Sequence, residues 1–166
     1  MTKQIKSIAM EEQIDSNGRL KRSDFLSFDL DHELYAIDIK EVEEIRVWEV
    51  PTIIPRSPDC VLGVINLKGM IVPIMDLRIR FNIGSVKYLP TTVVLILKAG
   101  EVAGKRTMGI VVDAVSDVID MGDNNLLPPI GDSQVIPFVS GLLNVNNQVV
   151  SVLDVDLLLD INGLMH

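Results

Sequence analysis

Two stretches of this chain, about eighty residues apart, are near copies of each other: NLKGMIVPIMDLR at 66–78 and NVNNQVVSVLDVD at 144–156. When residues 63–81 are placed over 141–159, four of the nineteen positions are identical and nine more exchange one large apolar residue for another. The identical pairs are Gly63 and Gly141, Asn66 and Asn144, Val72 and Val150, and Asp76 and Asp154. An internal repeat of this kind predicts two similar structural units.

The repeat extends upstream, because residues 36–45 also match residues 109–118. Apolar runs separated by turn residues predict about five strands in each half. A half of about seventy residues has a thin core, so two halves gain stability by packing on each other. Five short strands close most easily as a small barrel. The sequence therefore predicts an all-β fold of two similar five-stranded barrels with a shared core, although two Val- and Ile-rich hairpins can also look alike by chance.

The ordered domain is expected to cover residues 24–161, in halves of approximately 24–90 and 91–161. Residues 1–23 are polar and have little to bury, which predicts a flexible N-terminal tail. No stretch of ten or more residues has apolar residues at helical spacing, and residues 40–48 allow only a single helical turn. Aromatic residues make up 4% of the chain, so Val, Ile and Leu must form the core.

The net charge of −8 and the sequence pI of about 4.7 argue against nucleic acid as a partner, because an acidic surface repels phosphates. Cys60 is the single cysteine, so no disulfide forms within the chain, which is typical of a reducing compartment. The longest uninterrupted apolar run is the five residues 93–97, far too short to span a membrane. Residues 1–23 contain no apolar segment typical of a signal peptide. We expect a cytoplasmic protein that does not insert into the membrane.

The residues that most catalytic sites need are scarce in this chain. His32 and His166 lie near no nucleophile motif, and no Cys and His cluster has the spacing of a zinc site. The repeated acids Asp76 and Asp154 could share a proton, as the pair in an aspartic protease does. That chemistry needs a small residue and a glycine after each acid, and neither acid is followed by them. Capping of a short helix is the better explanation of both acids, so we expect no enzyme, no metal and no cofactor.

Three separated motifs, YAIDIKEVEEIR, GVINLKGMIVPIMDLRIRF and GIVVDAVSDV, resemble the CheW family of bacterial chemotaxis coupling proteins, over about residues 25–161. The resemblance implies a CheW-like fold of two intertwined five-stranded SH3-like β-barrel subdomains with short helical segments. It also implies a non-catalytic adaptor that couples the tips of methyl-accepting chemoreceptors to the regulatory domain of the histidine kinase CheA. The receptor's helical hairpin would lie in the groove between the subdomains, and the adaptor would be recruited to membrane-associated receptor arrays.

The resemblance assigns roles to individual residues. The receptor groove is implied to contain Val42, Glu44, Lys68, Val115 and Val118. The kinase surface is implied to lie on the first barrel, and we expect it at Leu67, Met70 and Val72. Gly63 and Gly109 match glycines expected to allow turns or close packing.

Several of these assignments compete with simpler interpretations. The three groove valines have a spacing that also suits the core, Glu44 could be a solvated acid, and at least one kinase position is expected to be core. Lys68 stands where the family usually has Arg, and it keeps the charge but loses the planar fork that pairs with two oxygens at once.

Three alternative functions stay open from the sequence alone. They are a CheW-like scaffold of another receptor–kinase system, a double-barrel domain that binds a small ligand in a polar pocket, and a hydrolase using the acid pair.

Overall fold

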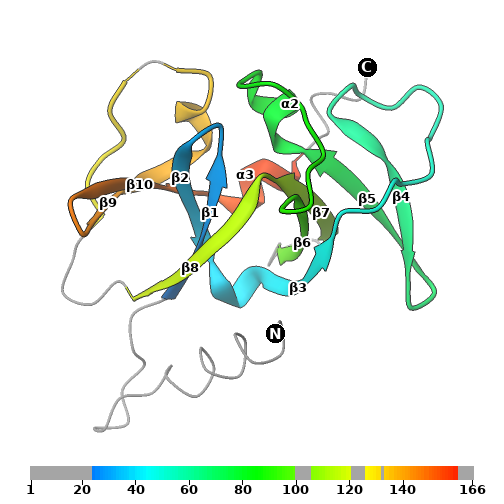
Figure 1. The fold of residues 1–166 in the computed structure, drawn as a ribbon, viewed down its shortest axis with the longest axis horizontal. Helices are drawn as coiled ribbons and strands as arrows, with labels where there is room; N and C mark the ends of the chain where they lie inside the picture. Colours follow the sequence, from blue (N-terminus) through cyan, green and yellow to red (C-terminus); the bar gives the residue numbers. More distant parts are fainter. Residues whose placement is uncertain (1–23, 100–105, 121–125, 132, 161–166) are drawn as a thin grey trace, which may run out of the picture.

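The computed structural model describes residues 24–99, 106–120, 126–131 and 133–160, and the expected tail of residues 1–23 lies outside them. Within these ranges the chain forms two five-stranded sheets and four short helical segments (Figure 1). The strands are β1 (Asp24–Leu30), β2 (Glu33–Asp38), β3 (Val42–Val47), β4 (Val61–Leu67), β5 (Met70–Asp76), β6 (Val93–Ala99), β7 (Arg106–Val112), β8 (Ala114–Asp120), β9 (Val139–Val145) and β10 (Gln148–Leu153). The helical segments are η1 (Ile39–Glu41), α2 (Leu77–Phe81), η2 (Ile136–Phe138) and α3 (Val155–Leu159).

Each sheet contains strands from both halves of the repeat. One sheet has the order β8-β1-β2-β10-β9 and the other β3-β6-β7-β5-β4, and they lie side by side in Figure 1. The first half thus supplies β1 and β2 to one sheet and its last three strands to the other, and the second half does the reverse. The expected all-β fold of two intertwined five-stranded subdomains is confirmed. The sequence halves 24–90 and 91–161 do not each form one sheet, because each sheet is completed by the other half.

The repeat is reproduced in the strand register. Strand β5 pairs in parallel with β7, with Ile74 opposite Gly109. Strand β10 pairs in parallel with β2, with Val152 opposite Ala36. The repeat aligns Ile74 with Val152 and Gly109 with Ala36, so these are the same contact made once by each half. Chance likeness between two hairpins does not produce matching register across sheets, so the duplication is structural.

Three hairpins turn through two consecutive residues in the left-handed backbone region, the pattern of type I′ turns that suits the twist of paired strands. The turn residues are Asp31 (φ 52°) and His32 (φ 65°), Lys68 (φ 53°) and Gly69 (φ 84°), and Asn146 (φ 51°) and Asn147 (φ 64°). The helical turn allowed over residues 40–48 is limited to η1. Val42 and Ile45 lie instead in β3, because that strand pairs with β6 along its length.

The repeated acids cap the short helices, as expected. The Asp76 side chain accepts a hydrogen bond from the backbone N–H of Arg78 at 3.0 Å, at the start of α2. The Asp154 side chain accepts one from the N–H of Leu157 at 3.2 Å, at the start of α3. Each aspartate thus satisfies a backbone donor that has no partner within its helix.

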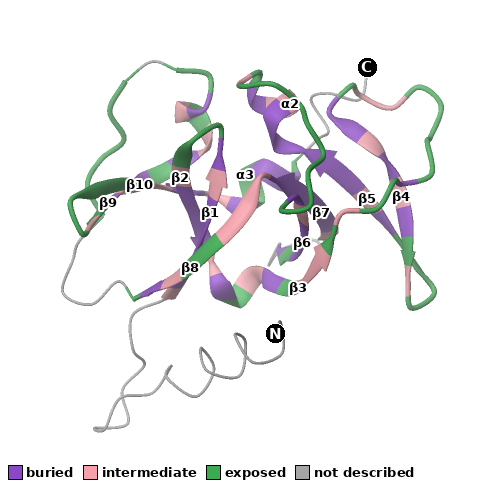
Figure 2. Ribbon diagram, viewed as in Figure 1, coloured by how far each residue is buried: buried purple, intermediate pink, exposed green. Residues whose placement is uncertain are grey.

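The core has three parts, which follow the strand exchange. A large central cluster contains side chains of both sheets, among them Phe28, Leu95 and Leu153. Two smaller clusters each belong to one sheet, the first around Val150 and the second around Ile96. Figure 2 shows buried strands converging on the middle of the molecule, where the sheets meet. The shared cluster is what lets two thin sheets exclude enough water to be stable.

Two predicted structural glycines lie where no side chain fits. Gly63 has φ +154°, and a Cβ there would lie 2.1 Å from the backbone oxygen of Thr52. A Cβ on Gly109 would lie 2.6 Å from Cδ1 of Ile74. The repeat partner of Gly63, Gly141, is also close to backbone, because its Cβ would lie 2.8 Å from a backbone oxygen. Close packing against backbone requires glycine at Gly63, whereas a side chain at Gly109 would require the ends of the neighbouring side chains to move.

Candidate functional site

Strands β3 and β8 occupy equivalent edge positions, one in each sheet, and both lie on the near side of Figure 1. Ile45 on β3, and Val115 and Val118 on β8, are partly buried and pack against the central core. Val42 is 1% exposed and belongs to that core, so its side chain supports the edge from within. The two edge strands thus carry apolar side chains that pack on one shared core and stay partly exposed to solvent.

The two charged residues expected in the receptor groove are not paired with each other. Glu44 is half-buried on β3, and its Oε1 lies 3.2 Å from Nη1 of Arg46. Lys68 is exposed at the tip of the β4–β5 hairpin, and among the described residues it has no ion pair. The carboxylate of Glu44 is therefore held by its own strand, and the ammonium of Lys68 stays available.

The three residues expected at the kinase surface differ in exposure. Met70 is 51% exposed, Leu67 is half-buried opposite it, and Val72 is fully buried in the core of its sheet. Ile71 is 62% exposed and was not predicted. The run MIVPIM is apolar on both faces of the strand, so alternation in the sequence could not show which side chains point to solvent.

A buried ionic cluster joins α2 to the start of β8. The Arg78 guanidinium donates from Nε and Nη2 to the Asp76 carboxylate at 3.0 and 2.9 Å, and from Nη1 to Asp113 at 3.0 Å. Asp113 also accepts from the backbone N–H of Asp31, in the β1–β2 turn, at 2.8 Å. The cluster therefore links both sheets. The sequence did not predict it, because Arg78 and Asp113 are 35 residues apart.

Aromatic rings cover this cluster from the side of β3. Trp48 stacks on Tyr88, with ring centroids 4.2 Å apart, and the Arg78 guanidinium lies 5.2 Å from the Tyr88 centroid. Burial, together with the charge of Asp76 and a 3.1 Å hydrogen bond to it, raises the pKa of Tyr88 to about 12. Burial acts to lower the pKa of Arg78, but the hydrogen bonds and charges of Asp76 and Asp113 outweigh it and raise the pKa. The guanidinium of Arg78 therefore stays charged across neutral pH.

This arrangement does not support acid–base catalysis by the repeated acids. Asp76 is fully buried and neutralised by Arg78, whereas Asp154 holds the first turn of α3. In the described part of the chain no hydrogen bond joins Asp76 to Asp154. Two acids that share a proton must lie side by side, and these two carboxylates have different partners.

A partly open hollow of about 570 Å³ lies beside the ionic cluster and is lined in part by Asp29, His32, Lys87 and Asp113. The carboxylate of Asp113 is already bound to Arg78 and to the backbone of the β1–β2 turn. Across the described ranges, no group of three or more His, Cys, Asp or Glu side chains could hold a metal ion. Nor does any helix there have the length and apolar character needed to cross a membrane.

Comparison with known proteins points to one family. Residues 24–162 match the family model described as the CheW-like domain. The chemotaxis protein CheW of Klebsiella aerogenes is 38% identical over 144 residues, which cover 86% of this chain and 84% of that protein. CheW of Thermotoga maritima is 29% identical over 143 residues, covering 85% and 90%. The crystal structure of the scaffolding protein TtCheW from Thermoanaerobacter tengcongensis superposes with a TM-score of 0.77 at 30% identity, covering 90% of this chain and 95% of that one.

Proposed function

The chain belongs to the CheW-like family of chemotaxis scaffold proteins, and from this we propose that it couples chemoreceptor tips to the regulatory domain of a CheA-type histidine kinase. The proposal places it in the cytoplasm, at receptor arrays. The observation that carries it is the pair of equivalent edge strands, β3 and β8, whose open apolar side chains rest on one shared core.

For the receptor, we propose the face formed by Ile45, Val115 and Val118, with Glu44 at its border. These apolar side chains are partly buried yet open, which suits the apolar stripe of a partner helix laid between the two edges. Val42 contributes from beneath, because its buried side chain fixes the start of β3. Lys68 would contact the receptor through its free ammonium group.

For the kinase, we propose the β4–β5 hairpin, with Met70 and Ile71 as its exposed apolar side chains and Leu67 beside them. Val72 would act indirectly, because it packs beneath this face in the core of the sheet. The family resemblance gives the kinase's regulatory domain the same double-barrel fold, so the contact would join one barrel to another. Exposed apolar residues on a rigid hairpin are typical of the centre of such an interface.

Such an adaptor works by geometry and mass action, without catalysis. The receptor face on β3 and β8 adjoins the kinase face at Lys68 in the β4–β5 turn. Because one chain carries both faces, binding of the first partner raises the effective concentration of the second. The receptor face rests on the central core, whereas the kinase hairpin rests on the smaller cluster of its own sheet, which contains Val72. No residue has to donate or accept a proton for this function.

The first test is titration calorimetry of the chain against the regulatory domain of a CheA-type kinase from the same organism. We expect saturable one-to-one binding, weakened about tenfold or more by Ile71→Asp, since a buried carboxylate at an interface is unfavourable. Val149→Asp is the matched control, because Val149 is the repeat partner of Ile71 and is 64% exposed on the second hairpin.

Equal weakening by both substitutions would refute the assignment of the kinase face to the first hairpin. Absence of any binding by the unaltered chain would refute coupling to this kinase. It would favour a receptor–kinase system of another kind.

A further inference from the structure

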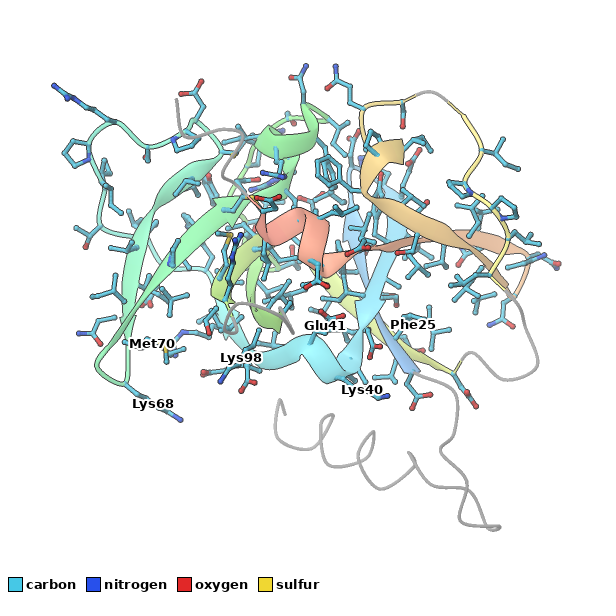
Figure 3. The ribbon with its side chains drawn as sticks, turned by 180° about the vertical axis from the view of Figure 1, so that it is seen from behind. Phe25, Lys40, Glu41, Lys68, Met70 and Lys98 are labelled. Atoms are coloured by element: carbon cyan, nitrogen blue, oxygen red, sulfur yellow. The ribbon has the colours of Figure 1, made fainter. Side chains whose placement is uncertain are left out.

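Three exposed lysines lie in a row along one end of the sheet that contains β3 to β7, where its strands begin or end. Figure 3 shows Lys68 at the tip of the β4–β5 hairpin, Lys98 in the middle of the row and Lys40 at the turn that leads into β3. Strand pairing agrees with this placement, because Leu97 lies opposite Val42 and puts Lys98 beside the start of β3. We define these three residues as the lysine edge.

The lysine edge gathers three basic side chains that make no ion pair with any described residue. In the described part of the chain, the ion pairs are made by arginines, with Arg46, Arg78 and Arg106 each bound to a carboxylate within 4 Å. None of the three lysines makes an ion pair with any described residue. An acidic chain with a net charge of −8 thus keeps three free ammonium groups in one row.

The position of this row relates it to the proposed receptor face. Lys40 lies two residues before β3 begins, and β3 carries Ile45 and Glu44 of that face. Lys68 lies at the other end of the row, and Lys98 fills the interval between them in Figure 3. A helix that crosses the start of β3 and runs along the row from Lys40 to Lys68 would pass over all three ammonium groups.

We infer that the lysine edge binds acidic side chains on the helices of the receptor hairpin and extends the receptor contact beyond the apolar face. The inference rests on the proposed function and specifies the chemistry of the partner, which is an acidic helical surface. Acids spaced three or four residues apart on a helix share one side and would meet a row of lysines. The row begins next to β3 of the proposed receptor face, and this continuity favours the receptor's helices over an anionic membrane as the occupant.

The test measures binding of a chemoreceptor cytoplasmic hairpin fragment from the same organism at about 0.05 M and about 0.5 M salt. The variant combines Lys40→Glu, Lys68→Glu and Lys98→Glu. We expect about thirtyfold weaker binding at low salt, roughly threefold per lysine, and a much smaller difference at high salt. Lys87→Glu is the matched control, because Lys87 is also exposed and without an ion pair to any described residue.

The outcomes separate this inference from the proposed function. If the unaltered chain binds the hairpin and the triple variant binds it equally well, the lysine edge is not a contact, although the adaptor role stands. About threefold weakening by Lys87→Glu, the amount expected for one lysine of the row, would show a general charge effect and would also overturn the inference. Binding of the unaltered chain to phosphatidylglycerol vesicles and not to the hairpin would replace the acidic helix with a lipid surface. Circular dichroism of each variant confirms that it is folded.

Discussion

Substitution of Arg78 by Met tests whether the buried ionic cluster stabilises the fold. The side chains of Arg78 and Asp76 are 2% and 0% exposed, and their charged atoms lie 2.9 Å apart. Met reaches about as far as Nε of the arginine and carries no charge, so Arg78→Met removes the guanidinium and keeps an apolar stem. The carboxylate of Asp76 would remain in place and keep only its hydrogen bonds from Tyr88 and from the backbone N–H at position 78.

The expected loss in the free energy of unfolding follows from the Asp76 carboxylate, which Arg78→Met leaves without its ionic partner. Removal of one partner from a buried ion pair typically costs about 3–5 kcal/mol, because the other charge stays buried without compensation. The pair with Asp113, which is 34% exposed, adds at most about 1 kcal/mol. For a chain of this length, about 4 kcal/mol corresponds to a fall in Tm of roughly 10 °C. That is a large share of the total stability of a single domain.

Urea unfolding followed by far-UV circular dichroism measures this cost. Trp48 fluorescence is unsuitable, because Trp48 stacks on the tyrosine beside Arg78 and its signal would change with the substitution itself. Arg46→Met is the control: Arg46 also pairs with an acid two residues away, at 3.2 Å, but its side chain is 31% exposed. We expect it to lose less than about 1 kcal/mol. If Arg78→Met lost no more than Arg46→Met, the argument from burial would be refuted.

Two further predictions concern stability. Gly63→Ala should cost about 2–4 kcal/mol, because the new methyl group meets the oxygen of Thr52. Gly69→Ala, where φ is +84° and no atom lies within 4 Å, should cost only about 1 kcal/mol, and similar midpoints in urea for the two variants would contradict this. Burial and the neighbouring charge of Glu33 raise the pKa of Tyr35 from 10.0 to about 12. Its contribution to stability is complete below pH 10 and is lost as the pH rises towards 12, because the unfolded chain then releases the proton first. Unfolding in urea measures how far the free energy of unfolding falls between about pH 9 and about pH 11.5. This fall should be about 2 kcal/mol smaller in Tyr35→Phe than in the unaltered chain, and an equal fall in both would exclude this role for Tyr35.

The strand pattern and the repeat could be predicted from the sequence because both depend on local alternation and on turn residues. The repeat aligned Ile74 with Val152, and their parallel pairs with Gly109 and Ala36 agree with that alignment. The pairing of halves across sheets could not be derived from periodicity, because a repeat shows that two units are alike and not which strands they exchange. That feature came from the family resemblance.

Exposure at the candidate surfaces was harder to predict for a physical reason. Val72 and Ile71 are adjacent and both apolar, yet one is buried and the other 62% exposed. In a thin sheet both faces carry apolar residues, so composition does not reveal the face that meets solvent. The ionic cluster could not be predicted because Arg78 and Asp113 are distant in the sequence. Asp113 is brought to Arg78 where the chain passes from β7 to β8.

The exchange of strands between the sheets has a consequence for how such a chain originates and folds. A single half, β1 to α2, would leave both of its sheet fragments with unpaired edges, but two copies of it would complete each other around a two-fold axis. An ancestral half-length chain with this strand order would have had to dimerise by strand exchange, and the single chain makes the same exchange within itself. During synthesis the sheet that contains β3 to β7 has all its strands once β7 ends at Val112, whereas the sheet that begins with β1 and β2 waits for β10, more than a hundred residues later, so a ribosome has to release nearly the entire domain before the first-begun sheet is complete.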